Sequence, residues 1–150
     1  MVSPFDFGQF AGHDLIWIPA EGGDANLIAP ARGTGTPHFG PEKDRVYVYS
    51  GSQGLTSMRY DGTDRRTHLK VTGPGLYFAE EPVPADDIRI SPSGHWVMAH
   101  VGNQLHVLAL PAIGGDAPTV NIKTASVPAK QITDVGADYW AWADGGTTIT

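Results

Sequence analysis

Glycine and proline recur too often in this chain for a long helix to form. The 150 residues include 19 Gly and 12 Pro, about a fifth of the chain, against roughly 12% in average usage. The longest stretch without either residue runs from Thr63 to Thr72. Its ten positions are fewer than the mean globular helix of about 11 to 12 residues. The sequence therefore excludes an all-α fold and argues against a doubly wound α/β fold.

Segments typical of β-strands lie between these interruptions. Four of them combine β-branched and aromatic residues and are bounded by Gly, Pro or Asp, namely 15–18, 45–49, 96–101 and 104–110. Hairpin signals recur along the chain, because Gly and Asx residues accept the positive φ of tight reversals. They are Gly22-Gly23, Asp61-Gly62, Ser93-Gly94 and Gly102-Asn103. We therefore expect an all-β fold in which each strand pairs with the next.

Charge and hydropathy exclude two classes of partner. Sixteen acidic against ten basic side chains give a net charge of −6, which repels phosphate backbones, so we expect no nucleic acid partner. No window has the 18 or so apolar residues of a membrane span, so we expect no membrane partner. The stretch Met1 to Phe10 lacks the basic start and apolar run of a signal peptide. The absence of Cys removes disulfides, thiolate metal sites and cysteine nucleophiles, and leaves the compartment open.

The strand-like segments recur in a fixed order, which indicates a repeat architecture. Three apolar anchors, Phe39, Ile90 and Trp142, are 51 and 52 positions apart and precede a turn and a β segment. Leucines at 15, 55 and 105 mark a second series, with offsets of 40 and 50. A period of about 40 to 50 with four short strands per unit is typical of a β-propeller blade. We expect buried anchors, a half blade at about 12–30, full blades at about 36–72 and 87–133, and a half blade at about 138–150.

Several of these segments carry a family resemblance. The stretches 37–49 and 54–66 together resemble one TolB-like propeller repeat, and 90–97 is similar to the turn that recurs in those repeats. More narrowly, 102–105, 110–115 and 136–142 resemble the propeller region that precedes the catalytic barrel in some secreted amidohydrolases. The resemblance covers about 12–150 and implies a module that scaffolds or binds, of a type often periplasmic or secreted. The turns at 40–44 and 143–145 depart from the family's pattern, which leaves the strand register open.

The expected strand count is that of half a ring. In order, the chain supplies two strands, two sets of four and a final two, which make three blades, whereas a ring usually has about four to eight. We expect a two-fold homodimer in which the last two strands of one chain complete the blade begun by the first two of the other, giving six blades. The alternative is an excerpt of a longer chain, such as the accessory propeller of an amidohydrolase-type hydrolase.

Motifs for metal or cofactor chemistry are weak. No two histidines are two positions apart, so the His-x-His motif of amidohydrolase metal sites is missing. His95 and His100 are five apart, which places them on opposite sides of a strand. A contact between His100 and His106 across the Gly102-Asn103 turn would give two ligands, which make a weak site. The carboxylate pairs Glu80/Glu81 and Asp86/Asp87 could hold Ca²⁺, but such residues more often keep a loop solvated. We expect no metal and no cofactor.

Catalytic motifs are equally weak. Ser52 lies in Ser-Gly-Ser-Gln-Gly, which lacks the first glycine of a nucleophile turn and precedes a strand. Gly33-Thr34-Gly35 is followed by Pro37 and no lysine, so it is a poor phosphate loop. Asp61, Asp64, Arg65 and Arg66 resemble an acid–base cluster but stand beside Gly62, which makes them turn residues. We predict no catalytic residue.

Aromatic and inner-strand residues remain as candidates. The aromatic side chains are expected to pack between blades rather than form a ligand platform; they are Trp17, Trp96, Trp140, Trp142, Tyr47, Tyr49 and Tyr139. On the innermost strands, His38 and Arg89 alternate with the apolar anchors, with Ala141 as the third equivalent. Facing a central channel, His38 and Arg89 would suit a small anion or an acidic side chain. The sequence thus predicts a noncatalytic binding or assembly module for a protein or small-molecule ligand of unknown identity.

Overall fold

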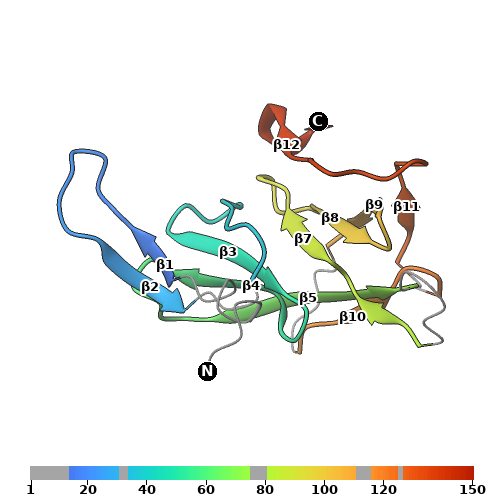
Figure 1. Ribbon diagram of the computed structural model, residues 1–150, viewed down its shortest axis with the longest axis horizontal. Coiled ribbons are helices and arrows are strands. Elements are labelled where there is room, and N and C mark those ends of the chain that lie inside the picture. Colours follow the sequence, from blue (N-terminus) through green and yellow to red (C-terminus); the bar gives the residue numbers. More distant parts are fainter. Residues whose placement is uncertain (1–13, 31–33, 75–80, 111–115, 125–126) are drawn as a thin grey trace, which may run out of the picture.

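The computed structural model describes residues 14–30, 34–74, 81–110, 116–124 and 127–150, and in these ranges the protein is all-β, as predicted (Figure 1). Its single described helical element is the 3₁₀ turn η2 (Asp144–Gly146). Within the described ranges, no helix is long and apolar enough to span a membrane. The strands are β1 (Asp14–Trp17), β2 (Asn26–Pro30), β3 (Arg45–Ser50), β4 (Gly54–Arg59), β5 (Arg66–Gly73), β6 (Val83–Pro84), β7 (Asp87–Ile90), β8 (Trp96–Val101), β9 (Gln104–Ala109), β10 (Thr119–Asn121), β11 (Ala129–Gln131), β12 (Trp142–Ala143) and β13 (Thr148–Ile149).

Four groups of strands follow one another along the chain. Sheet 1 is the antiparallel hairpin β1–β2. Sheet 2 is the meander β3-β4-β5, extended by a parallel pairing of β10 and a short antiparallel pairing of β6 with β5. Sheet 3 has the order β11-β9-β8-β7 with antiparallel neighbours, and sheet 4 is the hairpin β12–β13. None of the sheets closes on itself.

Tight turns at the predicted glycines join the strands. Gly62 between β4 and β5 has φ +78°, and Gly94 between β7 and β8 has φ +76°. The turn from β8 to β9 uses Gly102 (φ 56°) and Asn103 (φ 67°). These values lie in the left-handed region, which Gly and Asn adopt at low cost, so the hairpin registers follow from the turn residues.

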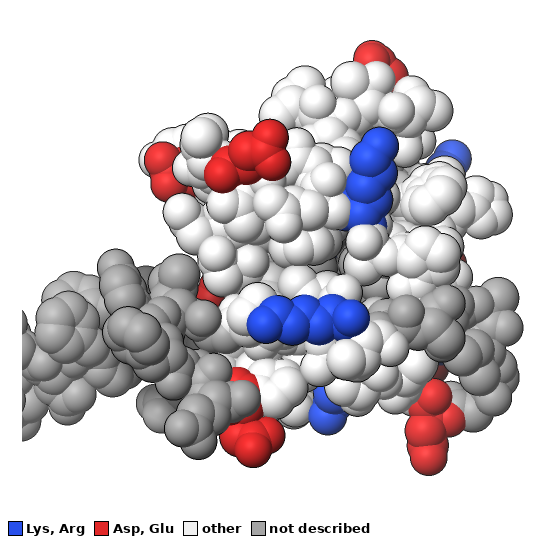
Figure 2. All heavy atoms as spheres, turned by 90° about the vertical axis from the view of Figure 1, so that its right-hand side faces the viewer, with Lys and Arg blue, Asp and Glu red and all other residues white. Residues whose placement is uncertain are grey.

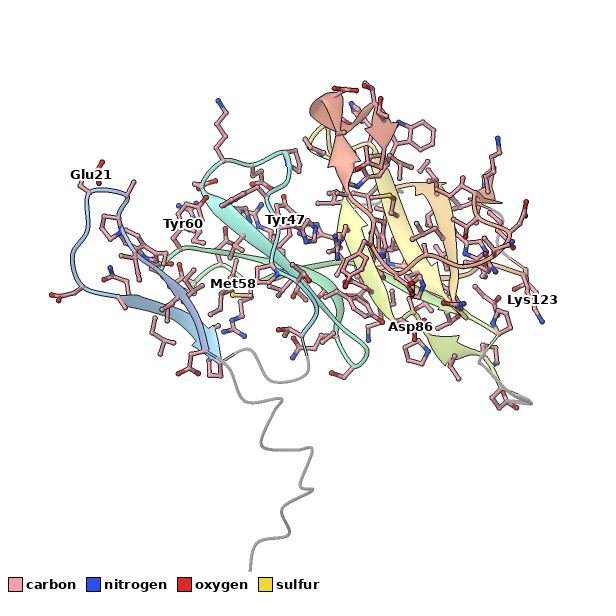
Figure 3. The ribbon with its side chains drawn as sticks, turned by 45° about the horizontal axis from the view of Figure 1, so that its top comes forward. Glu21, Tyr47, Met58, Tyr60, Asp86 and Lys123 are labelled. Atoms are coloured by element: carbon pink, nitrogen blue, oxygen red, sulfur yellow. The ribbon has the colours of Figure 1, made fainter. Side chains whose placement is uncertain are left out.

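The sheets stack face to face through apolar clusters. Sheets 2 and 3 share the largest cluster, in which Leu69 and Ile88 are fully buried. On the opposite face of sheet 2, Val46, Val48 and Met58 pack against Ile28 of sheet 1. On the opposite face of sheet 3, a third cluster reaches sheet 4. Figure 3 labels Tyr47 and Met58, which belong to clusters on the two opposite faces of sheet 2.

The repeat anchors do not share one environment. Ile90 is 2% exposed, as expected, and Trp142 is half-buried, but Phe39 is 72% exposed, so its predicted burial is wrong. The cause is the alternation of side chains along an extended segment. The backbone of His38 forms an isolated antiparallel β-bridge with that of Tyr47, and Tyr47 belongs to the cluster between sheets 2 and 3. Phe39 borders a hollow lined by sheet 1 residues, and the two strands of that sheet leave it uncovered.

Candidate functional site

The two predicted candidates, His38 and Arg89, connect three segments that belong to sheet 2, to sheet 3 and to the chain leading into sheet 4. His38 Nε2 accepts a hydrogen bond from the backbone N–H of Ile90, at 3.1 Å. Arg89 Nη1 donates to the carbonyl oxygen of Trp140, at 2.6 Å. The third equivalent, Ala141, exchanges two backbone hydrogen bonds with Thr150 beside β13. His38 and Arg89 therefore each tie one inner segment to the next.

His38 is held as a neutral imidazole. Because Nε2 accepts from the Ile90 N–H, the ring proton belongs on Nδ1, which lies 3.3 Å from the Thr36 carbonyl oxygen. Burial lowers the pKa of His38 to about 4, and the nearby positive charge of Arg89 acts in the same direction. At neutral pH this side chain is an uncharged structural link.

Arg89 is the centre of a more polar group. Its Nε lies 3.1 Å from Asp87 Oδ2, and its guanidinium carbon lies 4.1 Å from the centroid of the Trp140 ring. Trp140 also stacks on His100, with 6.5 Å between ring centroids. The Trp142 Nε1–H donates to the Arg89 carbonyl oxygen at 3.2 Å. Burial raises the pKa of Asp87, while the Arg89 charge opposes that shift. The group fixes the segment around residue 140 against β7.

The sequence did not indicate a second polar cluster, at the end of sheet 2. Arg45 is 1% exposed, and its Nε donates to Ser57 Oγ at 2.9 Å. The Ser57 hydroxyl also forms a hydrogen bond with His68 Nε2, 2.7 Å away. Arg45 Nη1 also donates to Asp64 Oδ2 at 2.7 Å. Hydrogen bonds from Arg66 and then Arg45 lower the pKa of Asp64 to about 2.

A Ser–His pair of this kind resembles part of a hydrolase triad, but its burial prevents that chemistry. Ser57 has no exposed surface. Burial lowers the pKa of His68, and the Arg45 charge adds to this effect. The Arg45 guanidinium also donates to this hydroxyl. The cluster satisfies a buried arginine rather than activating a nucleophile. One sequence feature could have indicated this cluster. Arg45 begins the strand Arg-Val-Tyr-Val-Tyr, in which alternation places its cation on the same face as two tyrosines, and both tyrosines are buried.

The contact between His100 and His106 that the sequence left open is not formed. His100 is the cross-strand partner of Leu105, and His106 is the partner of Ala99, so their side chains lie on opposite faces of sheet 3. His100 Nδ1 pairs with Asp86 Oδ2 at 3.2 Å. His100 Nε2 and His106 Nδ1 are buried without hydrogen-bond partners in the described ranges. No three His, Asp or Glu side chains of the described residues converge as metal ligands do.

The remaining candidates are turn or surface residues. Ser52 is exposed in the turn before β4, and Asp61 Oδ1 accepts from Thr63 within the β4–β5 turn. Gly33 and Glu80 lie outside the described residues. Asp86 and Asp87 bond to His100 and Arg89 respectively. On the face seen in Figure 2, charged side chains stand mostly apart from one another, with uncharged surface between them.

The aromatic side chains divide into two groups. Tyr47, Tyr49 and Trp140 are buried between sheets, which confirms the packing prediction for them. The hydroxyl of Tyr49 donates to the Ala85 carbonyl oxygen, and burial raises the pKa of Tyr49 to about 12. The packing prediction is wrong for three others, which are substantially exposed at 41%, 48% and 95%: Trp17, Trp96 and Tyr139. Comparisons with protein families, curated proteins and solved structures find no match for this chain.

Proposed function

We propose that this chain is a noncatalytic β-propeller module for binding or assembly, in which sheets 1 to 4 are consecutive blades or half blades. The observation that carries the proposal is the repeated tie between inner segments. His38 and Arg89 occupy equivalent repeat positions, and each bonds to the main chain of the next inner segment. A propeller arranges short sheets around a central axis, and links of this kind would join the innermost strands of successive blades.

The stacking of the sheets supports the same proposal. Each face of sheets 2 and 3 meets a neighbouring sheet through an apolar cluster, and apart from β10, which joins sheet 2, the strands of successive sheets follow one another along the chain. A β-sandwich would instead bury one face of each of two sheets and leave the others to solvent. Burial of both faces of the two larger sheets therefore favours a ring of blades.

The noncatalytic part of the proposal rests on what the polar side chains do. His38, Ser57, His68 and Arg89 each bond to another part of the protein. Elemental analysis of the purified chain provides a test, because one bound zinc per chain would contradict this part and favour the alternative of a hydrolase.

Homodimerisation is the proposed route to a closed ring. In sheet 1 the cross-strand pair Ile16 and Leu27 is 46% and 57% exposed. Placing β1 of a second copy beside β13 would make a four-stranded sheet from sheets 4 and 1. The Ile16–Leu27 face could then cover the face of sheet 3 that carries Leu105 and Val107. Unpaired strand edges favour such additions.

Light scattering tests this assembly directly. At micromolar concentration we expect twice the chain mass of 16.0 kDa. Ile16→Asp should shift the protein to the monomer, because the charge would be buried at the junction. Val135→Asp is the matched control, since Val135 is 95% exposed and lies outside the strands. A folded monomer of the unsubstituted chain would contradict homodimerisation.

A further inference from the structure

One arginine of the described chain differs from the others in having no acidic partner. Arg45, Arg59, Arg66 and Arg89 each lie within ion-pair distance of a carboxylate. Among the described residues, no carboxylate lies within 4.0 Å of Arg65. Its recorded polar contact is a long 3.4 Å approach of Nε to the Gly62 carbonyl oxygen. In a chain of net charge −6, Arg65 thus lacks the internal counter-charge that the other four described arginines have.

Arg65 borders a hollow with a second unpaired cation. A cavity of about 360 Å³ beside β4 and β5 is lined by Arg65 and Lys70 together with Ser52, Gln53, Thr56, Met58 and Thr67. Lys70, like the other described lysines, has no carboxylate within ion-pair distance in the described ranges. An adjoining cavity of about 130 Å³ shares five of these residues and extends to Leu15 and Ala29 of sheet 1. Among the described residues, neither lining includes Asp or Glu.

The backbone accommodates the lysine in this hollow. A Cβ at Gly54 would stand 2.7 Å from Lys70 Cγ and 2.4 Å from the Leu69 carbonyl oxygen. Gly54 has φ +81°, a conformation that other residues rarely adopt. Lys70 is half-buried, so its aliphatic part lies against the start of β4. The glycine therefore provides the space that this side chain uses.

The donors around the hollow define the ligand. Arginine offers five N–H donors and lysine three, and the lining adds the hydroxyls of Ser52 and Thr67 and the amide of Gln53. So many donors suit a group with several acceptor oxygens and more than one negative charge. The volume is at the small end of the range of roughly 300 to 1,000 Å³ for small-molecule sites, and exceeds what inorganic phosphate needs. We propose that this hollow binds the phosphate group of a small organic phosphate.

Amide chemical shifts test the proposal on the whole chain. Titration with phenyl phosphate should give saturable shifts at Gln53, Thr67 and Lys70. Acetate, which has two oxygens and a single charge, should bind at least about tenfold more weakly. Inorganic phosphate should lie between the two. Equal affinities for acetate and phenyl phosphate would overturn the assignment to phosphates, and non-saturating shifts would overturn the site itself.

Substitutions that each remove one positive charge identify the residues that bind the phosphate group. Arg65→Gln alters an exposed side chain and should weaken phenyl phosphate at least about tenfold, and Lys70→Gln should do the same. Lys130→Gln is the matched control, because it removes the same charge from β11, outside the lining. An equal loss in the Lys130 variant would show that net charge alone governs binding and would overturn the proposal. The result does not depend on the oligomeric state, so a monomeric propeller module leaves this test intact.

Discussion

Sheet 1 and sheet 2 are both built from short apolar hairpins, yet they bury their side chains very differently. In β3, Val46 to Tyr49 are all at most 5% exposed. In β1, Ile16 and Trp17 are 46% and 41% exposed, although their sequence is at least as apolar. The difference lies in the neighbours, because among the described residues sheet 2 has a sheet on each face and sheet 1 has one on a single face. Strand composition alone therefore does not determine burial in a stack of sheets.

The two junctions of sheet 3 differ in a similar way. Toward sheet 2, the junction is a wide apolar cluster with His38 as its polar link. Toward sheet 4, the apolar cluster is smaller, and Arg89, Asp87 and the indole of Trp140 carry more of the contact. Apolar burial stabilises in proportion to area, whereas an ionic contact that is partly screened by solvent adds less. We expect the junction with sheet 4 to separate first during unfolding.

The largest expected effect comes from the centre of the stack. Ile88 is fully buried between sheets 2 and 3, so Ile88→Ala should lower the free energy of unfolding by about 3 to 4 kcal/mol. Leu27→Ala on the exposed face of sheet 1 should cost less than about 0.5 kcal/mol in the monomeric chain. Urea unfolding followed by circular dichroism measures both. Equal losses would contradict the difference between the two regions.

The buried arginine gives the next largest effect. Arg45→Met keeps the apolar stem but leaves Ser57 and His68 without the guanidinium, so we expect a loss of about 2 to 3 kcal/mol. Arg59→Met removes a cation from the same end of sheet 2, but Arg59 is 52% exposed and should lose less than about 0.5 kcal/mol. Thermal unfolding of both variants provides the measurement. If Arg45→Met were as stable as the control, the buried cluster would not stabilise this end of the sheet.

The local features of this fold were predictable from the sequence, because they depend on neighbouring residues. Gly62, Gly94 and the Gly102-Asn103 pair have the positive φ values that their turns require. The strand at 96–101 agrees with β8 at both ends. These features follow from backbone sterics and β propensity, which act over a few positions.

Features that depend on distant residues were not predictable. The parallel pairing of β10 with β5 joins segments about 50 positions apart, and no local pattern indicates it. The exposure of Phe39 depends on how far sheet 1 extends over it. No local sequence pattern distinguishes Arg45 from Arg65. Only the fold brings the Asp64 carboxylate within hydrogen-bond distance of the Arg45 guanidinium. The polar clusters are set by such tertiary contacts.

Acid should weaken the junction between sheets 2 and 3 through His38. The pKa of His38 is lowered from 6.5 to about 4, so between these values the unfolded chain binds the proton more readily than the folded one. Stability from the neutral form is complete above about pH 6.5 and is lost as the pH falls toward 4. After allowance for partial exposure, the expected loss is about 2 kcal/mol. Asp64, whose pKa is lowered to about 2, contributes below this range.

A difference measurement separates His38 from the other titrating groups. Burial also lowers the pKa of His68 and of His106, and both shifts act in the same direction. His38→Gln should therefore remove only part of the decline in unfolding free energy between pH 6.5 and 4. His95→Gln alters an exposed histidine and should leave the decline unchanged. Parallel pH profiles for His38→Gln and the unsubstituted chain would contradict the role of His38.

The smallest expected effect sharpens the comparison between the two junctions. Arg89→Lys keeps the positive charge near Asp87 but loses the planar group that stacks on Trp140 and donates to its carbonyl oxygen. Because Arg89 is 22% exposed and its ionic contact is partly screened, we expect a loss of about 1 kcal/mol. Urea unfolding followed by tryptophan fluorescence measures it, with Arg59→Lys on the surface as the control. The loss should show as earlier exposure of Trp140, while the circular dichroism transition of sheets 2 and 3 moves less. If both signals shifted together, sheet 4 would unfold as one unit with the rest, and the two junctions of sheet 3 would be equally strong.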